Sequence, residues 1–414
     1  MTRHTPRAAA ALTVLVMLGL SFAAPVRVAA WLPEVGSLTA AATPIGTWSA
    51  PPAPPPGAAR LMPWFATSPR PVEPAAPAAA FSDTLRLRKV TTITGNLSPK
   101  SVVSSQQGLF FAQNMIYRHS VSVFDRDYQL VKTIHDRVRL SDFGYPKYDE
   151  FVKGGPVEAG FTPDRAYVYV SNYSMYGPGF AYPGGDGCTR QTRVDRSFVY
   201  RINVATLTID QAIRVGRVPK YVAVSPDGKY VVVTNWCSYD VSIIDVAQAK
   251  EVERILVGPH PRGIAIDAAS NKAYVGILYG DDIAVIDLDT FHLGWFRNIG
   301  SSPRHLILDP AGEFLYVSRS GADRISKIDL ATGTVVDSVA VGDDPRSMDI
   351  SDDGRSLYVG IYEANLVTKI RTSDMDVLQS LRTGNHPIGL TYDIATRQVW
   401  VSCYSGSIRV FHDE

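Results

Sequence analysis

Short segments in which β-branched and aromatic residues alternate with polar ones dominate the C-terminal half of the chain. Four such segments follow Pro219, at residues 221–224, 230–234, 241–244 and 252–256. Turn sequences separate them, such as Ser225-Pro226-Asp227-Gly228. Alternation with a period of two between turn signals predicts β-strands, and no segment of this region keeps a helical period. The pattern predicts units of four short strands.

The unit recurs every 42 residues. Three residue types keep this step, at Pro219, Pro261, Pro303, Pro345 and Pro387, at Gly216, Gly258, Gly300, Gly342 and Gly384, and at Asp245, Asp287 and Asp329. A fixed period of this length is typical of repeat architectures. Four strands per repeat predict that each unit is one blade of a β-propeller.

The same proline can be followed backwards to Pro99 and Pro156, which makes seven units. These first two steps are 57 and 63 residues long and exceed 42 by 15 and 21, so the first two blades carry insertions. The last unit, 387–414, has only 28 residues and lacks a fourth strand, which Leu85–Ile93 can supply. We therefore predict an all-β, seven-bladed propeller over residues 81–414, closed by an N-terminal strand that removes exposed edges.

Two strands carry a family motif. Tyr230–Asn235 reads Tyr-Val-Val-Val-Thr-Asn and Tyr167–Asn172 reads Tyr-Val-Tyr-Val-Ser-Asn, and the turns Ser225–Gly228 and Asp329–Gly333 accompany the repeat. The chain resembles the YVTN, or YncE-like, family of β-propeller repeat proteins over all seven units. The resemblance implies the fold and an exported protein of the cell envelope or surface. It implies no particular activity, because repeat residues form the scaffold.

The first 80 residues differ in composition from the repeats. Arg3, His4 and Arg7 precede an apolar run over 8–24, and Val28-Ala29-Ala30 follows it. This order predicts a cleaved signal peptide over 1–30 rather than a retained anchor, since the run is short of the about 20 residues that span a membrane. Residues 31–80 are rich in Ala and Pro and predict a largely disordered linker. We expect an exported protein, periplasmic, envelope-associated or secreted, with no membrane span after cleavage.

Three cysteines leave one unpaired in an exported chain. Cys188 lies in the insertion of the second blade and Cys237 in the corresponding loop of the third, and adjacent blades present these loops on one face. A Cys188–Cys237 disulfide is therefore one hypothesis, and two unpaired loop cysteines are the other. Cys403 falls at a strand position of the repeat, which favours a buried free thiol.

The residue after each proline suggests a binding site. In chain order these residues are Lys100, Val157, Lys220, Arg262, Arg304, Arg346 and Ile388, of which five are basic. Rotational symmetry turns a repeated position into a ring, and a ring of Lys and Arg in the channel would bind an anionic ligand. Alternatively, these side chains pack against the next blade and cap neighbouring aspartates. The formal net charge of +1 provides no global field for nucleic acid, which is therefore only weakly supported as a partner.

The two insertions, 135–155 and 173–196, should stand on the face that carries this ring. They contain aromatic residues that suit a lid over a ligand, namely Tyr145, Tyr148, Tyr176 and Tyr182. A small satellite cluster folded onto the blade is the equal alternative.

Catalytic motifs are mostly missing from the sequence. Neither Gly-x-Ser-x-Gly nor Cys-x-x-Cys-His occurs, and no cofactor or metal site is predicted. His260 and His386 share a repeat position and His305 is near it in register, so these histidines are the candidates for a base beside the arginines. We predict a monomeric binding protein for an anionic or aromatic ligand or an envelope protein partner. The alternative is a lactonase-like hydrolase or isomerase that uses these histidines.

Overall fold

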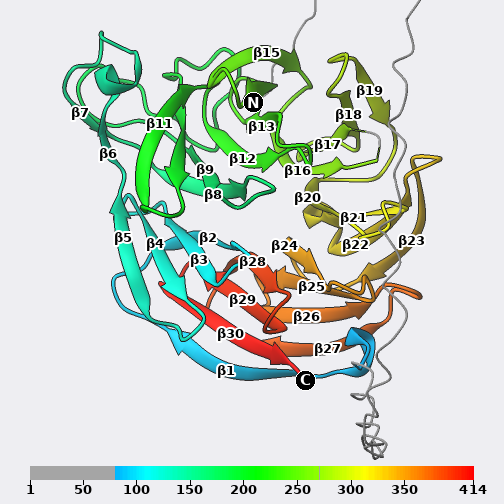
Figure 1. Ribbon diagram of the computed structural model, residues 1–414. Helices are drawn as coiled ribbons and strands as arrows, with labels where there is room; N and C mark the ends of the chain where they lie inside the picture. The colour runs from blue at the N-terminus through cyan, green and yellow to red at the C-terminus, as the bar shows by residue number, and fades with distance from the viewer. Residues whose placement is uncertain (1–79, 270) are drawn as a thin grey trace, which may run out of the picture. The chain divides into compact units, whose positions relative to one another are not determined.

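Seven four-stranded antiparallel sheets form the part of the chain that the computed structural model describes, residues 80–269 and 271–414. Their innermost strands face one another around a common axis (Figure 1). The predicted seven-bladed, all-β propeller is confirmed. The predicted signal peptide and all but the last residue of the predicted linker lie outside the described residues.

Each blade is a sheet of four strands, and the inner strand of each blade begins at the repeated proline. The first three blades consist of β2 (Pro99–Ser104), β3 (Leu109–Asn114), β4 (Ser120–Asp125) and β5 (Leu130–His135); β8 (Pro156–Phe161), β9 (Tyr167–Asn172), β10 (Phe198–Asn203) and β11 (Thr208–Arg214); and β12 (Pro219–Val224), β13 (Tyr230–Asn235), β14 (Asp240–Asp245) and β15 (Lys250–Leu256). The next three consist of β16 (Pro261–Asp267), β17 (Lys272–Ile277), β18 (Ile283–Asp287) and β19 (Leu293–Phe296); β20 (Pro303–Leu308), β21 (Phe314–Arg319), β22 (Arg324–Asp329) and β23 (Thr334–Ala340); and β24 (Pro345–Ile350), β25 (Ser356–Ile361), β26 (Leu366–Arg371) and β27 (Val377–Arg382).

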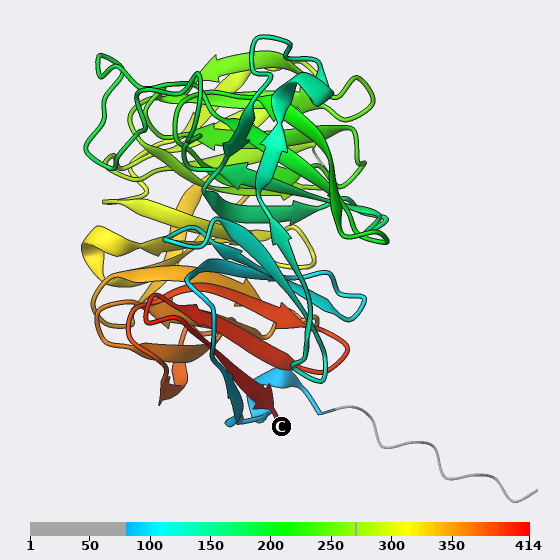
Figure 2. The same cartoon turned by 90° about the vertical axis from the view of Figure 1, so that its left-hand side faces the viewer.

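Blade seven combines the two ends of the propeller sequence. It contains β28 (Pro387–Asp393), β29 (Gln398–Cys403), β30 (Ser407–Asp413) and β1 (Leu87–Ile93), and β1 pairs antiparallel with β30 so that Leu87 lies opposite Asp413. In the side view the blue N-terminal segment lies beside the red C-terminal strand (Figure 2). Closure by the N-terminal strand, predicted for Leu85–Ile93, is thus confirmed.

A buried ion pair reinforces this closure. The Lys369 ammonium of β26 donates to both carboxylate oxygens of Asp413 at 2.6 and 2.7 Å, and to the carbonyl oxygens of Ser82 and Leu85. Tyr358 donates its hydroxyl proton to the same carboxylate at 2.6 Å. Both charged side chains are fully buried, so blade six is joined to β30 and to the segment directly before β1.

Every inner strand begins at the predicted proline and contains a β-bulge directly after it. In all seven blades the register with the second strand shifts within three residues of the proline. In the last five blades the residue before the proline has a left-handed backbone with φ between 54° and 57°. A bulge changes the direction of the side chains beside it. This local geometry determines where the residue after each proline points.

The hydrophobic core lies between neighbouring blades. The cluster between blades three and four, for example, packs Val232 and Ile243 against Ile264, Val275 and Ile286. The insertion after blade one forms a separate hairpin, β6 (Arg137–Arg139) and β7 (Phe151–Lys153). The described residues also contain three short 3-10 helices, η1 (Ser82–Thr84), η2 (Leu140–Phe143) and η3 (Ser320–Ala322). None of the described helices is long and apolar enough to cross a membrane.

Candidate anion-binding site in the channel

Five basic side chains converge on one cavity of about 200 Å³ in the channel. They are the predicted ring residues Lys100, Lys220, Arg262, Arg304 and Arg346, which we call the basic ring. Each comes from a different inner strand, β2, β12, β16, β20 or β24, at the bulge that follows the proline. The other two members of the series, Val157 and Ile388, are buried apolar residues. The structure therefore places the repeated basic position inside the channel.

Few carboxylates balance these charges. Asp186 forms an ion pair with Lys220 at 2.5 Å, and Asp344 forms one with Arg346 at 2.6 Å. The Lys100 Nζ atom is buried without a hydrogen-bond partner among the described residues. Within the same residues, the guanidinium groups of Arg262 and Arg304 form no hydrogen bond or ion pair. Three of the five cations thus retain unused donors, which a bound anion can satisfy.

Burial and mutual repulsion lower the pKa values of three side chains of the basic ring. Lys100, Lys220 and Arg262 are less than a tenth exposed. Burial, followed by repulsion from Arg262, holds the pKa of Lys100 well below its ordinary value and lowers that of Lys220 to about 7, although Asp186 acts in the opposite direction on Lys220. The same two causes lower the pKa of Arg304 to about 9. Bringing an anion into the cavity relieves this repulsion.

A second ring of repeat residues forms the aromatic wall of the cavity. The residue directly after the second strand of each blade is Met115, Tyr173, Trp236, Leu278, Ser320, Tyr362 or Tyr404. Five of these seven line the cavity, together with Tyr279. The Lys220 ammonium lies 4.3 Å from the ring centre of Tyr173 and 5.0 Å from that of Trp236, which are favourable cation–π distances.

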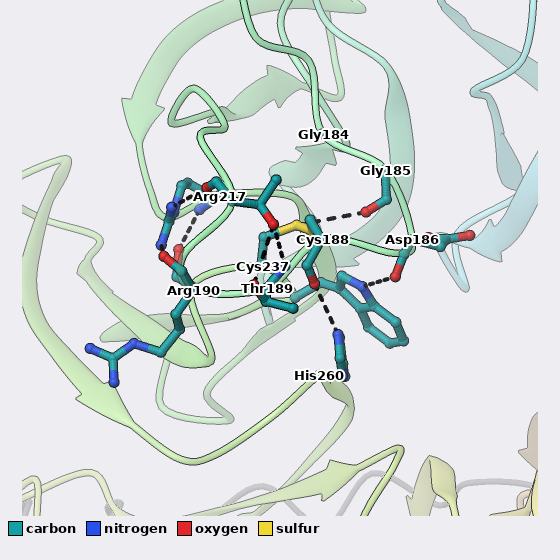
Figure 3. The surroundings of a disulfide bond; sticks show 12 residues. Gly184, Gly185, Asp186, Cys188, Thr189, Arg190, Arg217, Cys237 and His260 are labelled. Atoms are coloured by element: carbon teal, nitrogen blue, oxygen red, sulfur yellow. Dashed lines mark hydrogen bonds between the residues drawn. A yellow bond between two sulfur atoms is a disulfide. The ribbon is translucent and has the colours of Figure 1, made fainter.

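A disulfide-linked loop places Asp186 at this cavity. Cys188 and Cys237 form the predicted disulfide, with 5.4 Å between their Cα atoms (Figure 3). His260 donates from Nε2 to the Cys188 carbonyl at 3.1 Å, and Trp236 donates its indole proton to the Asp186 carbonyl at 3.0 Å. Partial burial acts to raise the pKa of Asp186, but the Lys220 ammonium, the Tyr173 hydroxyl and Arg262 together lower it to about 2. The loop thus holds an ionised carboxylate against the basic ring.

A hydrogen bond crosses the channel beside Arg262, Arg304 and Arg346, at a level that we call the floor. Tyr221 of blade three and His305 of blade five meet at 2.9 Å between Oη and Nε2. The strand between them carries Gly263 at this level, where a Cβ would lie 2.6 Å from the Arg304 carbonyl oxygen. His305 accepts the Met348 amide proton at Nδ1, so the neutral ring holds its own proton on Nε2. Burial and Arg262 lower the pKa of His305 to about 3.

Below this floor the channel opens into a second cavity of about 420 Å³ with mainly aliphatic walls. Glu158 lines it beside Tyr221 and His305, and burial raises the pKa of Glu158 despite the opposing charge of Lys100. Asp349 lies further along the same cavity, where burial raises its pKa to about 6. The channel is therefore cationic and aromatic on one side of the floor and mainly apolar on the other.

The four tyrosines predicted as a lid do not line the basic cavity. Tyr145 packs edge-on against Phe198 with 5.0 Å between ring centres, and Tyr148 stacks on Phe180 at 4.9 Å. Tyr176 contacts His119, and Tyr182 lies under Arg193. Tyr145 and Tyr148 bury their apolar surface against blade two, which is the satellite-cluster alternative, whereas Tyr176 and Tyr182 are exposed.

The three predicted histidines are also separated. His260 packs among Trp236, Tyr239 and Tyr279, whereas His386 stacks on Tyr362 with 4.4 Å between ring centres. Only His305 lies beside the arginines of the basic ring. Among residues 80–269 and 271–414, no three His, Cys, Asp or Glu side chains are grouped so that they could hold a metal ion.

Several residues of the cavity escaped the sequence prediction. Trp236, Leu278 and Tyr404 follow the 42-residue step, so the repeat itself could have identified them once the ends of the second strands were aligned. Asp186 lies in an insertion without a repeat. In the sequence, only the predicted Cys188–Cys237 disulfide indicated that the loop of Asp186 lies near the channel.

Comparison with known families agrees with the architecture. Residues 310–397, from the loop after β20 to the turn before β29, match the family model of the YNCE-like beta-propellers. Over this segment the chain is similar to the YNCE-like beta-propellers. The resemblance predicted from the repeat motifs is therefore confirmed, while a search of curated proteins found no match.

Among solved structures, many chains match this propeller. One is a chain of the hydrazine synthase of Kuenenia stuttgartiensis, with a TM-score of 0.60 and 18% sequence identity. The match covers 77% of this chain and 96% of the other. At this identity the likeness concerns the fold alone.

Proposed function

We propose that this YNCE-like propeller is an exported binding protein whose basic ring recognises a small anionic ligand. The observation that supports it is the set of unused donors on one cavity: among the described residues, the buried Lys100 amine has no hydrogen-bond partner, and the guanidinium groups of Arg262 and Arg304 have no hydrogen bond or ion pair. Leaving buried donors unsatisfied costs free energy. An anion that fills the cavity satisfies them and offsets their mutual repulsion.

The cavity also limits the size of the ligand. Its volume of about 200 Å³ is below the roughly 300–1,000 Å³ of pockets for drug-sized molecules, so the ligand is a small acid or phosphate. The aromatic wall of Tyr173, Trp236 and Tyr404 can pack against an apolar or planar part of it. The disulfide on the same face is compatible with an exported protein.

The hydrolase alternative receives less support from the site. His305 is the histidine beside the arginines, but both its ring nitrogens are hydrogen-bonded and its pKa is lowered to about 3. A general base works best with a pKa near the operating pH. We therefore favour binding over hydrolysis by a histidine base.

Calorimetric titration with citrate, inorganic phosphate and pyruvate, at low and high salt, tests the proposal. We expect salt-weakened binding of at least one of these anions to the wild type, and at least a tenfold loss of affinity in Arg262→Ala/Arg304→Ala. The matched control is Arg88→Ala/Arg297→Ala, which removes two exposed charges outside the cavity and should leave the affinity unchanged. Absence of binding to the wild type, or equal affinities in both double variants, would contradict the proposal.

A further inference from the structure

Lys100 is the member of the basic ring with the most unusual environment. Its side chain is 4% exposed, and its Nζ atom has no hydrogen-bond partner among the described residues. Lys220, Arg262 and Arg304 act on it as like charges, and burial is the largest cause of its strongly lowered pKa. Burial and these like charges all favour the unprotonated form of the amine. Unprotonated lysines beside other cations are the ones that attack carbonyl groups.

The surroundings of this amine select the carbonyl compound. Arg262 and Arg304 have free guanidinium groups on the same cavity, and an arginine fork fits a carboxylate with two hydrogen bonds. The cavity already accommodates one carboxylate, because Asp186 binds Lys220 at its wall. A ligand that carries a carboxylate next to a carbonyl group would place the carboxylate on the arginines and the carbonyl carbon near an amine.

A second group can move the protons that imine formation requires. Glu158 lies on β8, the inner strand next to β2, and its charge acts on Lys100. It also lines a small cavity at the floor together with Arg262 and Arg304. Burial is the main cause that raises the pKa of Glu158, and Lys100 opposes it. Burial thus favours the protonated form of this carboxyl, which is a suitable acid for the loss of water.

We propose that Lys100 forms a Schiff base with small 2-oxo acids, whose carboxylate is held by Arg262 and Arg304. This inference rests on the proposed anion site and names its ligand class. The amine lone pair attacks the carbonyl carbon, and the carbonyl π electrons move to its oxygen. That oxygen takes up the proton lost by nitrogen, which gives a carbinolamine. Glu158 then protonates the hydroxyl group, which leaves as water while the nitrogen lone pair forms the C=N bond. The products are a protonated imine on Lys100, one water and the Glu158 carboxylate as its counter-ion.

Reductive trapping tests this directly. The full chain is incubated with pyruvate, treated with borohydride, which reduces the imine irreversibly, and then digested and mapped by mass spectrometry. We expect a 1-carboxyethyl group on Lys100 in preference to all other lysines. The preference should persist at pH values where exposed lysines are protonated. Lactate, which has the same carboxylate and no carbonyl group, should leave no adduct.

Variants separate chemistry from binding. Lys100→Arg keeps hydrogen-bond donors at this position but has no primary amine, so it should lose the adduct and still bind lactate. Lys250→Met is the matched control, because it removes an exposed lysine outside the cavity and should leave Lys100 labelled. Glu158→Gln should slow trapping at least tenfold, with the largest effect at low pH, where the carboxyl is the proton donor.

The outcomes distinguish this inference from the site on which it rests. If pyruvate and lactate both bind in a salt-dependent manner and no adduct forms on Lys100, the Schiff base is refuted and the anion site stands. If none of the tested anions binds, the proposed function itself fails. An adduct spread evenly over surface lysines, or found on Lys220 instead, also refutes the assignment. Mapping of the wild type gives this result even if Lys100→Arg does not fold.

Discussion

Replacing Lys369 by methionine should weaken the propeller at the point where its ring closes. The ammonium of Lys369 donates to Asp413 of β30 and to two carbonyl oxygens of the segment before β1. Its removal leaves the fully buried Asp413 carboxylate with the Tyr358 hydroxyl and no cation. Breaking one partner of a buried ion pair costs about 3–5 kcal/mol, since the remaining charge is uncompensated.

The expected change in melting temperature follows from the size of the domain. Globular proteins unfold with an entropy of about 2.1 cal/mol/K per residue, which for roughly 330 residues is about 0.7 kcal/mol/K. A loss of about 3–5 kcal/mol then lowers Tm by about 4–7 °C. Differential scanning calorimetry measures Tm, and urea unfolding gives the free energy independently.

Lys327→Met is the matched control for this prediction. Lys327 occupies the same repeat position one blade earlier, but its ammonium donates one hydrogen bond, to the Thr372 carbonyl oxygen at 3.0 Å, and forms no ion pair with the described residues. We expect a loss of about 1 kcal/mol. The double variant Lys369→Met/Asp413→Asn, which removes both charges, should recover part of the stability. A Tm for Lys369→Met within 1 °C of the control would refute the reasoning.

Three further expectations concern closure, the disulfide and pH. A chain starting at Asn96 lacks β1 and exposes the edge of β30, so light scattering should show aggregation; a stable monomer would contradict the closure argument. Cys188→Ala/Cys237→Ala should lower the free energy of unfolding by up to about 4 kcal/mol, measured by urea unfolding, because the bridge closes a 49-residue loop. Anion affinity should fall as pH rises through about 7, because a bound anion favours the protonated form of Lys220, and a pH-independent affinity would exclude this linkage.

The sequence predicted the propeller because each unit repeats its own turn and strand signals. The step of 42 residues fixes where the inner strands of the last five blades begin, and all seven observed inner strands start at the predicted prolines. The short last unit predicted that another strand must complete it, and β1 does so. These turn and strand signals are local and recur in each repeat, so the strands can be predicted from short segments of the sequence.

The direction of the side chains depended on geometry that the sequence does not show. The repeat identified the basic residues after each proline, but whether they face the channel is determined by the bulges of the inner strands. The lid tyrosines lie in insertions without internal repeats, so only packing against blade two decides their place. Tyr145, for example, is fixed by Phe198 and by the Arg214 amide, contacts that appear only after folding.

The pairing of β1 with β30 also has a consequence for the order of synthesis. β1 leaves the ribosome before every blade, and its partner β30 leaves it after the other strands of the propeller. The first strand therefore stays without its partner while the blades between them are made, and the contact that unites them spans the whole ring. A polypeptide that terminates early cannot make this contact. Ring closure thus acts as a checkpoint for completeness, since unfinished chains keep an open sheet edge that quality-control proteases and chaperones can recognise.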